Sequence, residues 1–511
     1  MPDHSKEMKP HALLRRAAGV VVPCLMAAGL LAAAEGALRW SGFGVDQAPF
    51  LPEVSQGKTL WRLNKAYFEQ FLSLPVDTIS EWEYSEIVAE MPKPARVYRV
   101  FVFGESAAYG NPYVPFGVAA YLDALLSLAY PEVEFEVYNA ACPGVNSHIL
   151  QGLAAGCAEL SPDAFVMYVG NNESSAPYRP SRLLGPWPPG LVRAHMDLMQ
   201  LRLAQALLQT PVLAPMLTEP SDVTWDIEQG NSAVLAAYRA NLKEMARLAR
   251  DAGAEPVVCT IARYRATEEL PAPSPEALAD GSFERTFLGP SAVQAALDAE
   301  IPLADVEAAM ILEAPEENSG PRFFDDRLHF TFAGSFVAAR TVFELLSPMV
   351  AEKYGLTVPA VPPGRRDCER AMGLSHALEW RIMAPRYTGR PEERALFAPL
   401  ERDAESLPPS AAAVVLRDAV LADPDDTNLR RLYIDELLRL EAWPAAERAA
   451  RAFVQDFPYA RGAWRRLGLA LENGSKPGAA RGAYEKALAQ FPDDAESRKQ
   501  LETLPPPAWT G

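Results

Sequence analysis

Short apolar runs that alternate with helical stretches constrain the fold of this chain more than any other feature of its 511 residues. The runs are rich in β-branched and aromatic residues, and they read VYRVFVFG from residue 97, FEVYNA from 135, AFVMYVG from 164 and EPVVCTI from 255. Helical composition separates them at residues 116–130, 147–160 and 233–252. This alternation is typical of a parallel sheet covered by helices on both faces. The sequence therefore predicts a three-layer α/β/α domain, which we place at residues 96–355.

Two segments of this region do not follow the alternation. Residues 174–230 hold five closely spaced prolines and then the apolar stretch MDLMQLRLAQALL. We interpret them as an insertion over the carboxyl ends of the strands, where ligands of parallel sheets bind, and such an insertion could act as a lid. Residues 41–95 contain scattered prolines and aromatic residues without a clear period. We expect them to form a connector that packs on the α/β domain.

The amino terminus has the pattern of a membrane-targeting segment. Residues 1–16 carry four basic side chains, Lys6, Lys9, Arg15 and Arg16, and residues 17–34 are uncharged. A basic flank before an apolar run keeps the amino terminus in the cytoplasm and directs the rest outward. The run approaches the roughly 20 residues that span a bilayer, which favours an uncleaved transmembrane anchor at 17–37. A cleaved signal peptide is the alternative, because residues 31–34 read LAAA. Either reading places the main body on the periplasmic, or extracytoplasmic, side.

The carboxyl-terminal part is rich in alanine and leucine and contains a repeat. After the proline-rich break TVPAVPPGRR, which begins at residue 357, Pro424, Pro458 and Pro492 follow one another at intervals of 34 residues. Before the last of these prolines stand Trp464, Leu467, Gly468, Ala480, Tyr484 and Ala487. Their spacing resembles a tetratricopeptide (TPR) unit. We assign residues 356–408 to a linker with helices and 409–500 to TPR repeats, a unit separate from the α/β domain. The resemblance implies a protein partner; unrelated helical hairpins are the alternative.

Charge and cysteine content exclude some classes of function. The net charge is −18, and no basic cluster follows the first 16 residues, so we expect no nucleic-acid partner. The five cysteines form no C-x-x-C pair, so the sequence supports neither a metal site nor a cofactor. Cys142 and Cys157 could pair in an exported domain, but isolated buried thiols are the interpretation that we favour.

One serine and one histidine stand where catalytic groups are found. Ser106 follows the first predicted strand in the sequence VFGESAAYG, although a serine there is more often a surface hydroxyl or a helix cap. The hydrolase motif G-x-S-x-G is not present, because residue 108 is Ala. His329 lies in DDRLHFTFAG, three residues after Asp326, whose carboxylate could orient the imidazole. Taken alone, such a pair is more often a salt bridge at the start of a helix.

Two loops at strand ends offer hydrogen-bond donors. Gly144 follows the second predicted strand in NAACPGVNS, and Asn172 follows the third in GNNE. Each could be a plain turn, since Gly and Asn suit turns. Both could also donate to a developing oxyanion, through the backbone N–H of Gly144 and the side-chain amide of Asn172.

In chain order, the sequences GES, Gly, GNNE and DRLH resemble the SGNH family of hydrolases, also called GDSL esterases and lipases. The resemblance implies Ser106 as the nucleophile and His329 as the general base, with Asp326 orienting the histidine. It also implies an oxyanion hole made by the N–H of Ser106, by Gly144 and by Asn172.

The resemblance covers residues 97–350 and includes three departures. Glu105 stands where the family has Asp, Ala107 replaces the Leu of GDSL, and Glu173 stands where Asp is common. We therefore expect an enzyme without a cofactor that cleaves or transfers the acyl group of an ester at the cell envelope. An envelope polysaccharide O-acyltransferase is one form of this function. The alternative from a different class is a membrane-anchored, protein-binding scaffold whose SGNH-like domain is inactive.

Overall fold

The computed structural model of the protein describes residues 10–72, 79, 82–173, 178, 189–208, 232–265, 274–280, 283–286, 288–314, 320–387 and 390–505. Of the predicted insertion at 174–230, Tyr178 and residues 189–208 are described, and they include the helices α6 (Pro189–Met199) and α7 (Arg202–Leu208). The rest of the insertion, and with it the predicted lid, lies outside the described residues.

A five-stranded sheet forms the centre of the α/β region. Its strand order is β5-β4-β6-β7-β8, and every neighbouring pair is parallel. The strands are β4 (Val97–Gly104), β5 (Glu134–Ala141), β6 (Ala164–Tyr168), β7 (Glu255–Cys259) and β8 (Leu303–Ala304). Every residue of β4 is buried, which explains why this central strand is apolar throughout except for Arg99, which pairs with Glu136, rather than alternating. The prediction of an α/β fold with a parallel sheet is confirmed, and β8 is a strand that the sequence pattern missed.

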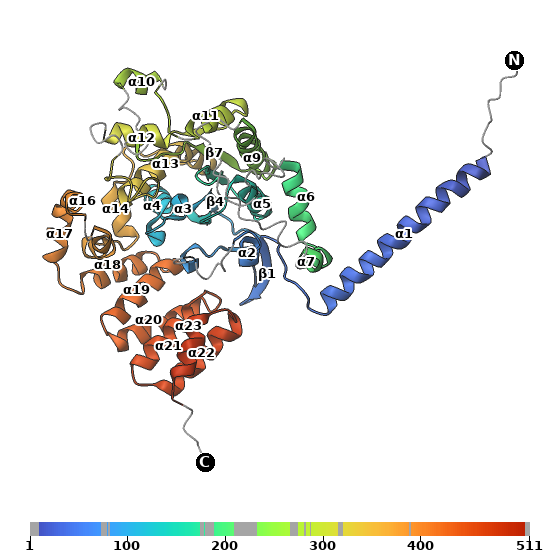
Figure 1. The fold of residues 1–511 in the computed structure, drawn as a ribbon. Helices are drawn as coiled ribbons and strands as arrows, with labels where there is room; N and C mark the ends of the chain where they lie inside the picture. Colours follow the sequence, from blue (N-terminus) through green and yellow to red (C-terminus); the bar gives the residue numbers. More distant parts are fainter. Residues whose placement is uncertain are drawn as a thin grey trace, which may run out of the picture.

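Helices cover both faces of this sheet (Figure 1). Helix α4 (Val118–Ala129) packs against α13 (Phe332–Tyr354), and α5 (Ser147–Ala158) packs against α9 (Ser232–Asp251). Four shorter elements belong to this part of the chain: α10 (Pro275–Asp280), α11 (Gly289–Asp298), α12 (Val306–Glu313) and η3 (Val114–Phe116). The helices contribute a large share of one hydrophobic core, in which Cys142 and Cys157 are both buried and neither forms a disulfide.

Residues 41–95 hold a second, antiparallel sheet that the sequence pattern did not predict. Its strands are β1 (Phe50–Ser55), β2 (Lys58–Leu63) and β3 (Val88–Glu90), and α2 (Lys65–Glu69) and η2 (Trp82–Ser85) lie between β2 and β3. Several apolar side chains of this segment belong to the main core, among them Phe50, Leu63, Phe68 and Trp82. β1 and β2 each expose part of their length, which weakened the strand signal.

The helices that follow α13 begin within the same core. They are α14 (Arg365–Ala371), α15 (His376–Met383), η7 (Ala384–Tyr387), α16 (Pro391–Leu396), α17 (Ala398–Glu405) and α18 (Ala411–Ala422). Cys368, Leu378 and Leu416 are buried in the core that contains α4, and Tyr121 of α4 donates a hydrogen bond of 3.1 Å to Glu369. The predicted boundary at residue 355 therefore does not coincide with an edge of the hydrophobic core.

Five further helices have small cores of their own. They are α19 (Thr427–Arg439), α20 (Trp443–Asp456), α21 (Ala463–Asn473), α22 (Pro477–Gln490) and α23 (Ala495–Thr503). Consecutive helices pack on each other, and a Cβ added to Gly468 would lie 2.4 Å from the ring of Tyr484. A glycine is therefore needed where α21 meets α22. This part of the chain is helical, and the assignment to TPR units stays a prediction.

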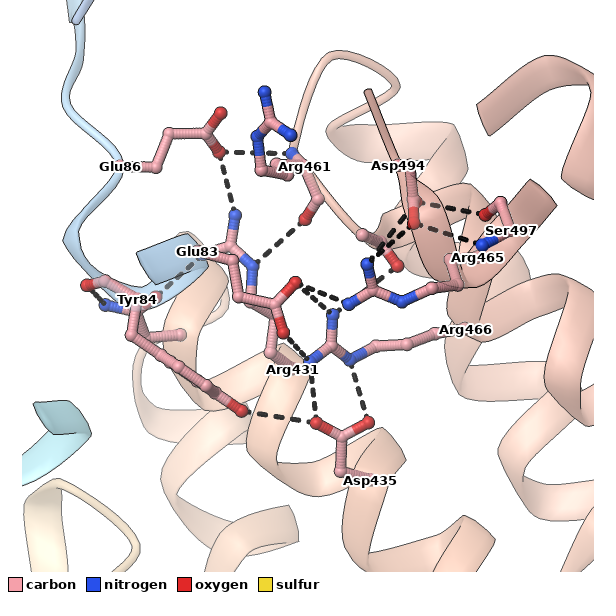
Figure 2. Close-up of polar contacts among 12 residues, drawn as sticks. Glu83, Tyr84, Glu86, Arg431, Asp435, Arg461, Arg465, Arg466, Asp494 and Ser497 are labelled. Atoms are coloured by element: carbon pink, nitrogen blue, oxygen red, sulfur yellow. Dashed lines mark hydrogen bonds and ion pairs between the residues drawn. The ribbon is translucent and has the colours of Figure 1, made fainter. Parts of the chain in front are cut away.

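An ion-pair network joins these helices to η2 and the residues just after it (Figure 2). Glu83 accepts hydrogen bonds from Arg466 at 2.6 Å and from Arg465 at 2.7 Å. Glu86 accepts from Arg431 of α19 at 3.0 Å and from the backbone N–H of Arg461 at 3.1 Å. Burial alone would raise the pKa of Glu83, but the arginines beside it, Arg466 first, hold that pKa below its ordinary value. Glu83 is therefore an anion at neutral pH.

Helix α1 (Pro10–Trp40) projects from the rest of the protein (Figure 1). Its 20 residues Val21–Trp40 are apolar enough to cross a membrane, and their most apolar window is not buried in the protein. Among the described residues this is the one helix of that kind. It is compatible with a membrane anchor or with a signal sequence.

Candidate active site

Ser106 stands at a tight turn between a strand and a helix. β4 ends at Gly104, Glu105 occupies the position before the next helix, and Ser106 is the first residue of that helix, α3 (Ser106–Tyr109). A Cβ on Gly104 would lie 2.4 Å from both Ala108 Cβ and the carbonyl oxygen of Tyr168, so only glycine fits at this corner. The turn leaves Ser106 partly accessible, whereas its neighbours on both sides are buried.

His329 and Asp326 lie on the loop that precedes α13. Asp326 Oδ1 accepts the backbone N–H of His329 at 2.9 Å, and Oδ2 lies 2.7 Å from Nδ1 of the same histidine. The other imidazole nitrogen, Nε2, lies 2.8 Å from Oγ of Ser106. The structure thus brings the three residues that the sequence singled out into one continuous chain of hydrogen bonds.

The charge of Asp326 determines the tautomer of this histidine. Burial would raise the pKa of Asp326, but the hydrogen bonds from His329 and Leu328 hold it well below the ordinary value. An ionised carboxylate at 2.7 Å holds a proton on Nδ1 of His329. The lone pair of Nε2 is then directed at the hydroxyl of Ser106, which is the arrangement that a general base requires.

Gly144 and Asn172 lie at the same sheet edge as Ser106. β5 and β6 are the two neighbours of β4, and all three strands are parallel. Gly144 follows β5 with a φ of 79°, a backbone conformation that glycine adopts without strain. Asn172 follows β6, and its Nδ2 donates one hydrogen bond of 3.0 Å to the carbonyl oxygen of Val145. An amide nitrogen carries two hydrogens, so the second can meet a substrate oxygen.

Two buried carboxyl groups join these loops. Glu105 accepts the backbone N–H of Gly170 at 2.9 Å, and Glu173 accepts both the N–H and the hydroxyl of Ser147 at 2.8 Å. Burial, with a smaller contribution from Glu173, raises the pKa of Glu105 to about 8, and burial raises that of Glu173 to about 7. Glu105 therefore connects the serine corner to the end of β6, and Glu173 connects the Asn172 loop to the start of α5.

Sequence patterns missed several residues that support the site. Asp325 accepts a hydrogen bond of 3.0 Å from Tyr113 and forms an ion pair with Arg386, which lies beyond the predicted domain boundary. Trp82 stacks on Tyr109, the last residue of α3, with ring centroids 6.4 Å apart. Asp325, the first Asp of the DDRLH segment, was a signal for the loop anchor. No local signal pointed to Arg386 or Trp82, because each depends on a contact between distant segments.

No group of three or more His, Cys, Asp and Glu side chains is arranged to hold a metal ion in the part of the chain that the structure describes. The polar groups near Ser106 are instead arranged in hydrogen-bonded pairs. This donor set fits acid–base chemistry on an organic substrate.

Comparison with known proteins gives similar structures but no similar sequence. No family model and no curated protein matches the chain. A putative GDSL-like lipase from Parabacteroides merdae matches in structure with 13% identity and a TM-score of 0.30, over 48% of this chain and 94% of the lipase. An acetylxylan esterase from Geobacillus stearothermophilus matches with 16% identity and a TM-score of 0.30, over 48% of this chain and 93% of the esterase. The structural neighbours are thus GDSL-like lipases and esterases, and they match about half of this chain.

Proposed function

We propose that this protein is a serine-dependent hydrolase or acyltransferase of ester substrates, with Ser106 as nucleophile, His329 as general base and Asp326 as the group that orients the histidine. The observation that supports the proposal is the hydrogen-bond chain from Ser106 Oγ to His329 Nε2 at 2.8 Å and from Nδ1 to Asp326 at 2.7 Å. A serine hydroxyl is a weak nucleophile by itself, and such a chain removes its proton as it attacks.

The first half of the reaction forms an acyl-enzyme. Ser106 Oγ bonds to the carbonyl carbon of the ester while its proton moves to His329 Nε2, and the carbonyl oxygen becomes an oxyanion. The N–H groups of Ser106 and Gly144 and the amide of Asn172 stabilise that charge. His329 then gives its proton to the alcohol oxygen, the carbon–oxygen bond of the ester breaks, and the alcohol leaves.

The second half transfers the acyl group to an acceptor. His329 removes a proton from water or from a sugar hydroxyl, whose oxygen attacks the carbonyl carbon, and Ser106 is released with its proton restored. Water gives hydrolysis, and a sugar hydroxyl gives O-acylation of a polysaccharide. The chemistry of the three side chains is the same for both acceptors.

We also propose that α1 anchors the protein in the membrane with the α/β domain on the outer side. The support is the apolar, exposed stretch Val21–Trp40, which follows the basic residues of the first 16 positions. A protein partner of α19–α23 is what the TPR resemblance implies, and the part of these helices at Arg431 and Arg466 is already occupied by Glu86 and Glu83.

A fluorophosphonate probe tests the catalytic proposal directly. The wild-type protein should be labelled covalently at Ser106 and should cleave an activated ester such as p-nitrophenyl acetate, whereas Ser106→Ala should do neither. The exposed Ser406, just after α17, offers the matched control, because Ser406→Ala should keep full labelling. If the wild-type protein is not labelled, the scaffold alternative takes the place of this proposal.

A further inference from the structure

Helix α7 and Gln200, which lies between α6 and α7, are joined to the base of the apolar helix α1 by several hydrogen bonds. Glu35 of α1 accepts the backbone N–H groups of Arg202 at 3.0 Å and of Leu203 at 2.8 Å, which lie in the first turn of α7. Arg39 donates to the carbonyl oxygen of Gln200 at 3.0 Å. These bonds join α1 to the body of the protein, so that α1 is not attached only through the following chain. Figure 1 shows α7 beside the base of α1, and α6 next to α7.

A second set of bonds holds the chain just after α1. Gln205 is almost completely buried, and its side chain accepts from the N–H of Val45 at 3.0 Å and donates to the carbonyl oxygen of Val45 at 2.9 Å. Gln200 donates to the carbonyl oxygen of Gln47 at 3.1 Å. Hydrogen bonds from α1 itself and from the chain just after it therefore both fix the position of α7 relative to α1.

Glu35 indicates where the contact between α1 and α7 lies relative to a bilayer. It is the first charged residue after the uncharged run at 17–34, and charged side chains lie at or beyond the edge of the hydrocarbon region. The first turn of α7 is bonded to Glu35 and therefore lies at the same depth. Trp40, at the end of α1, is 92% exposed, and tryptophan is enriched at the interface between lipid and water.

Helix α6 presents apolar side chains on two faces. Val192 is buried and Met196 packs against the main core, so one face is used within the protein. A second stripe is exposed and consists of Leu191, Ala194, Leu198 and Leu201. Their spacing of three to four residues places them on one side of the helix and its end. Leu198 is 48% and Leu201 is 42% exposed, and Leu201 directly follows the residue that Arg39 holds.

We propose that the outer face of α6 and the adjoining start of α7 lie in the headgroup region of the membrane that α1 anchors, with the exposed leucines inserted among the lipids. Apolar side chains of interfacial helices are buried at the boundary between headgroups and acyl chains, which is the depth that Glu35 gives to α7. This inference rests on the proposed membrane anchoring. It makes α6–α7 a second attachment, which fixes the orientation of the α/β domain over the bilayer.

Site-directed fluorescence in lipid tests this face with the full chain. Cys24 lies exposed on α1, and Cys142, Cys157, Cys259 and Cys368 are buried, so Cys24→Ser gives a background without an accessible thiol. Leu198→Cys and Leu201→Cys, each labelled with bimane, are compared with Leu421→Cys in phosphatidylcholine nanodiscs containing doxyl lipid. Leu421 is 73% exposed on α18, far from α1 in Figure 1. Wild-type protein labelled with bimane at Cys24 shows whether α1 itself lies in the membrane.

We expect doxyl lipid to quench bimane at 198 and 201 several-fold more than at 421. Equal quenching at all three positions, with strong quenching at Cys24, would overturn this inference and leave the anchor intact. Absence of quenching at Cys24 would overturn the membrane anchoring and this inference together. Protection of 198 and 201 from an aqueous quencher without quenching by lipid would show that a protein, either a partner or a second copy, covers the face instead.

Discussion

Glu83 accepts hydrogen bonds from Arg466, 2.6 Å away at the closest, although 383 positions separate the two residues in the chain. The next residue toward the amino terminus, Trp82, stacks on Tyr109 at the end of the helix that begins with Ser106. The carboxyl-terminal helices are therefore connected to the corner of the proposed nucleophile through one short segment.

This connection predicts that Arg466→Ala destabilises the protein. The side chain of Arg466 is 3% exposed, and its loss leaves Glu83 buried with one arginine fewer. Breaking a buried pair typically costs about 3–5 kcal/mol, whereas an exposed pair contributes about 0–1 kcal/mol. Arg417→Ala, which removes the exposed pair with Asp418, is the matched control. Urea unfolding of both variants measures the difference, and equal midpoints would contradict the structural role of the network.

The shared core predicts that a chain ending at residue 360 does not fold. Such a truncation removes Cys368, Leu378 and Leu416 from the core and takes Arg386 away from Asp325. The exposed apolar surface should cause aggregation, which size-exclusion chromatography detects. A soluble 1–360 chain that cleaves an ester would show that α14–α18 are dispensable.

The catalytic proposal predicts strong non-additivity between Ser106 and His329. Ser106→Ala should abolish turnover of an activated ester, because no other hydroxyl occupies the place 2.8 Å from His329 Nε2 among the described contacts. Adding His329→Ala should cost little more, since residues that act as one unit do not contribute separately. Steady-state rates of the two single variants and the double variant test this. Costs that add on a logarithmic scale would indicate independent roles.

Asn172→Ala should lower turnover without unfolding the protein. Loss of a single oxyanion donor typically costs about 10²–10³ in kcat, or about 3–4 kcal/mol. The variant also loses the bond to Val145, so its thermal midpoint should be measured beside the exposed control Asn473→Ala. A higher KM with unchanged kcat would contradict a role of Asn172 in the transition state.

The buried carboxyl of Glu105 predicts a pH dependence of stability. Its pKa is about 8 in the folded protein against an ordinary value of 4.5, so the folded state binds more protons than the unfolded state between these values. Stability from this group is therefore fully present below pH 4.5 and declines up to pH 8, by at most about 1.4 kcal/mol per pH unit. Glu105→Gln, which mimics the neutral form, should show a shallower decline. Unfolding free energies of the wild type and of Glu105→Gln, measured from pH 5 to pH 8, test this pH dependence. Parallel curves for the two proteins would show that Glu105 does not cause it.

Local sequence patterns were enough to predict the parallel sheet and the positions of the candidate catalytic and oxyanion-hole residues. β4, β6 and β7 are apolar runs because they are buried, β5 is a partly buried edge strand rich in aromatic and β-branched residues, and a parallel sheet necessarily brings the carboxyl ends of all four to one edge. The three-residue spacing of Asp326 and His329 likewise lies within one loop. The antiparallel sheet of residues 50–90 escaped prediction because its strands are short and partly exposed.

The sequence by itself determined the parallel α/β core, the apolar helix α1 and the loops that carry Ser106, Gly144, Asn172 and His329, because periodicity and turn residues act over a few positions. Only the tertiary structure decided the contacts that hold these parts together, such as Arg386 with Asp325 and Glu35 with α7. Charged residues on a helix look like a solvated surface in sequence. They become structural partners only when folding brings an opposite charge or an unpaired backbone N–H from a distant segment within hydrogen-bond distance.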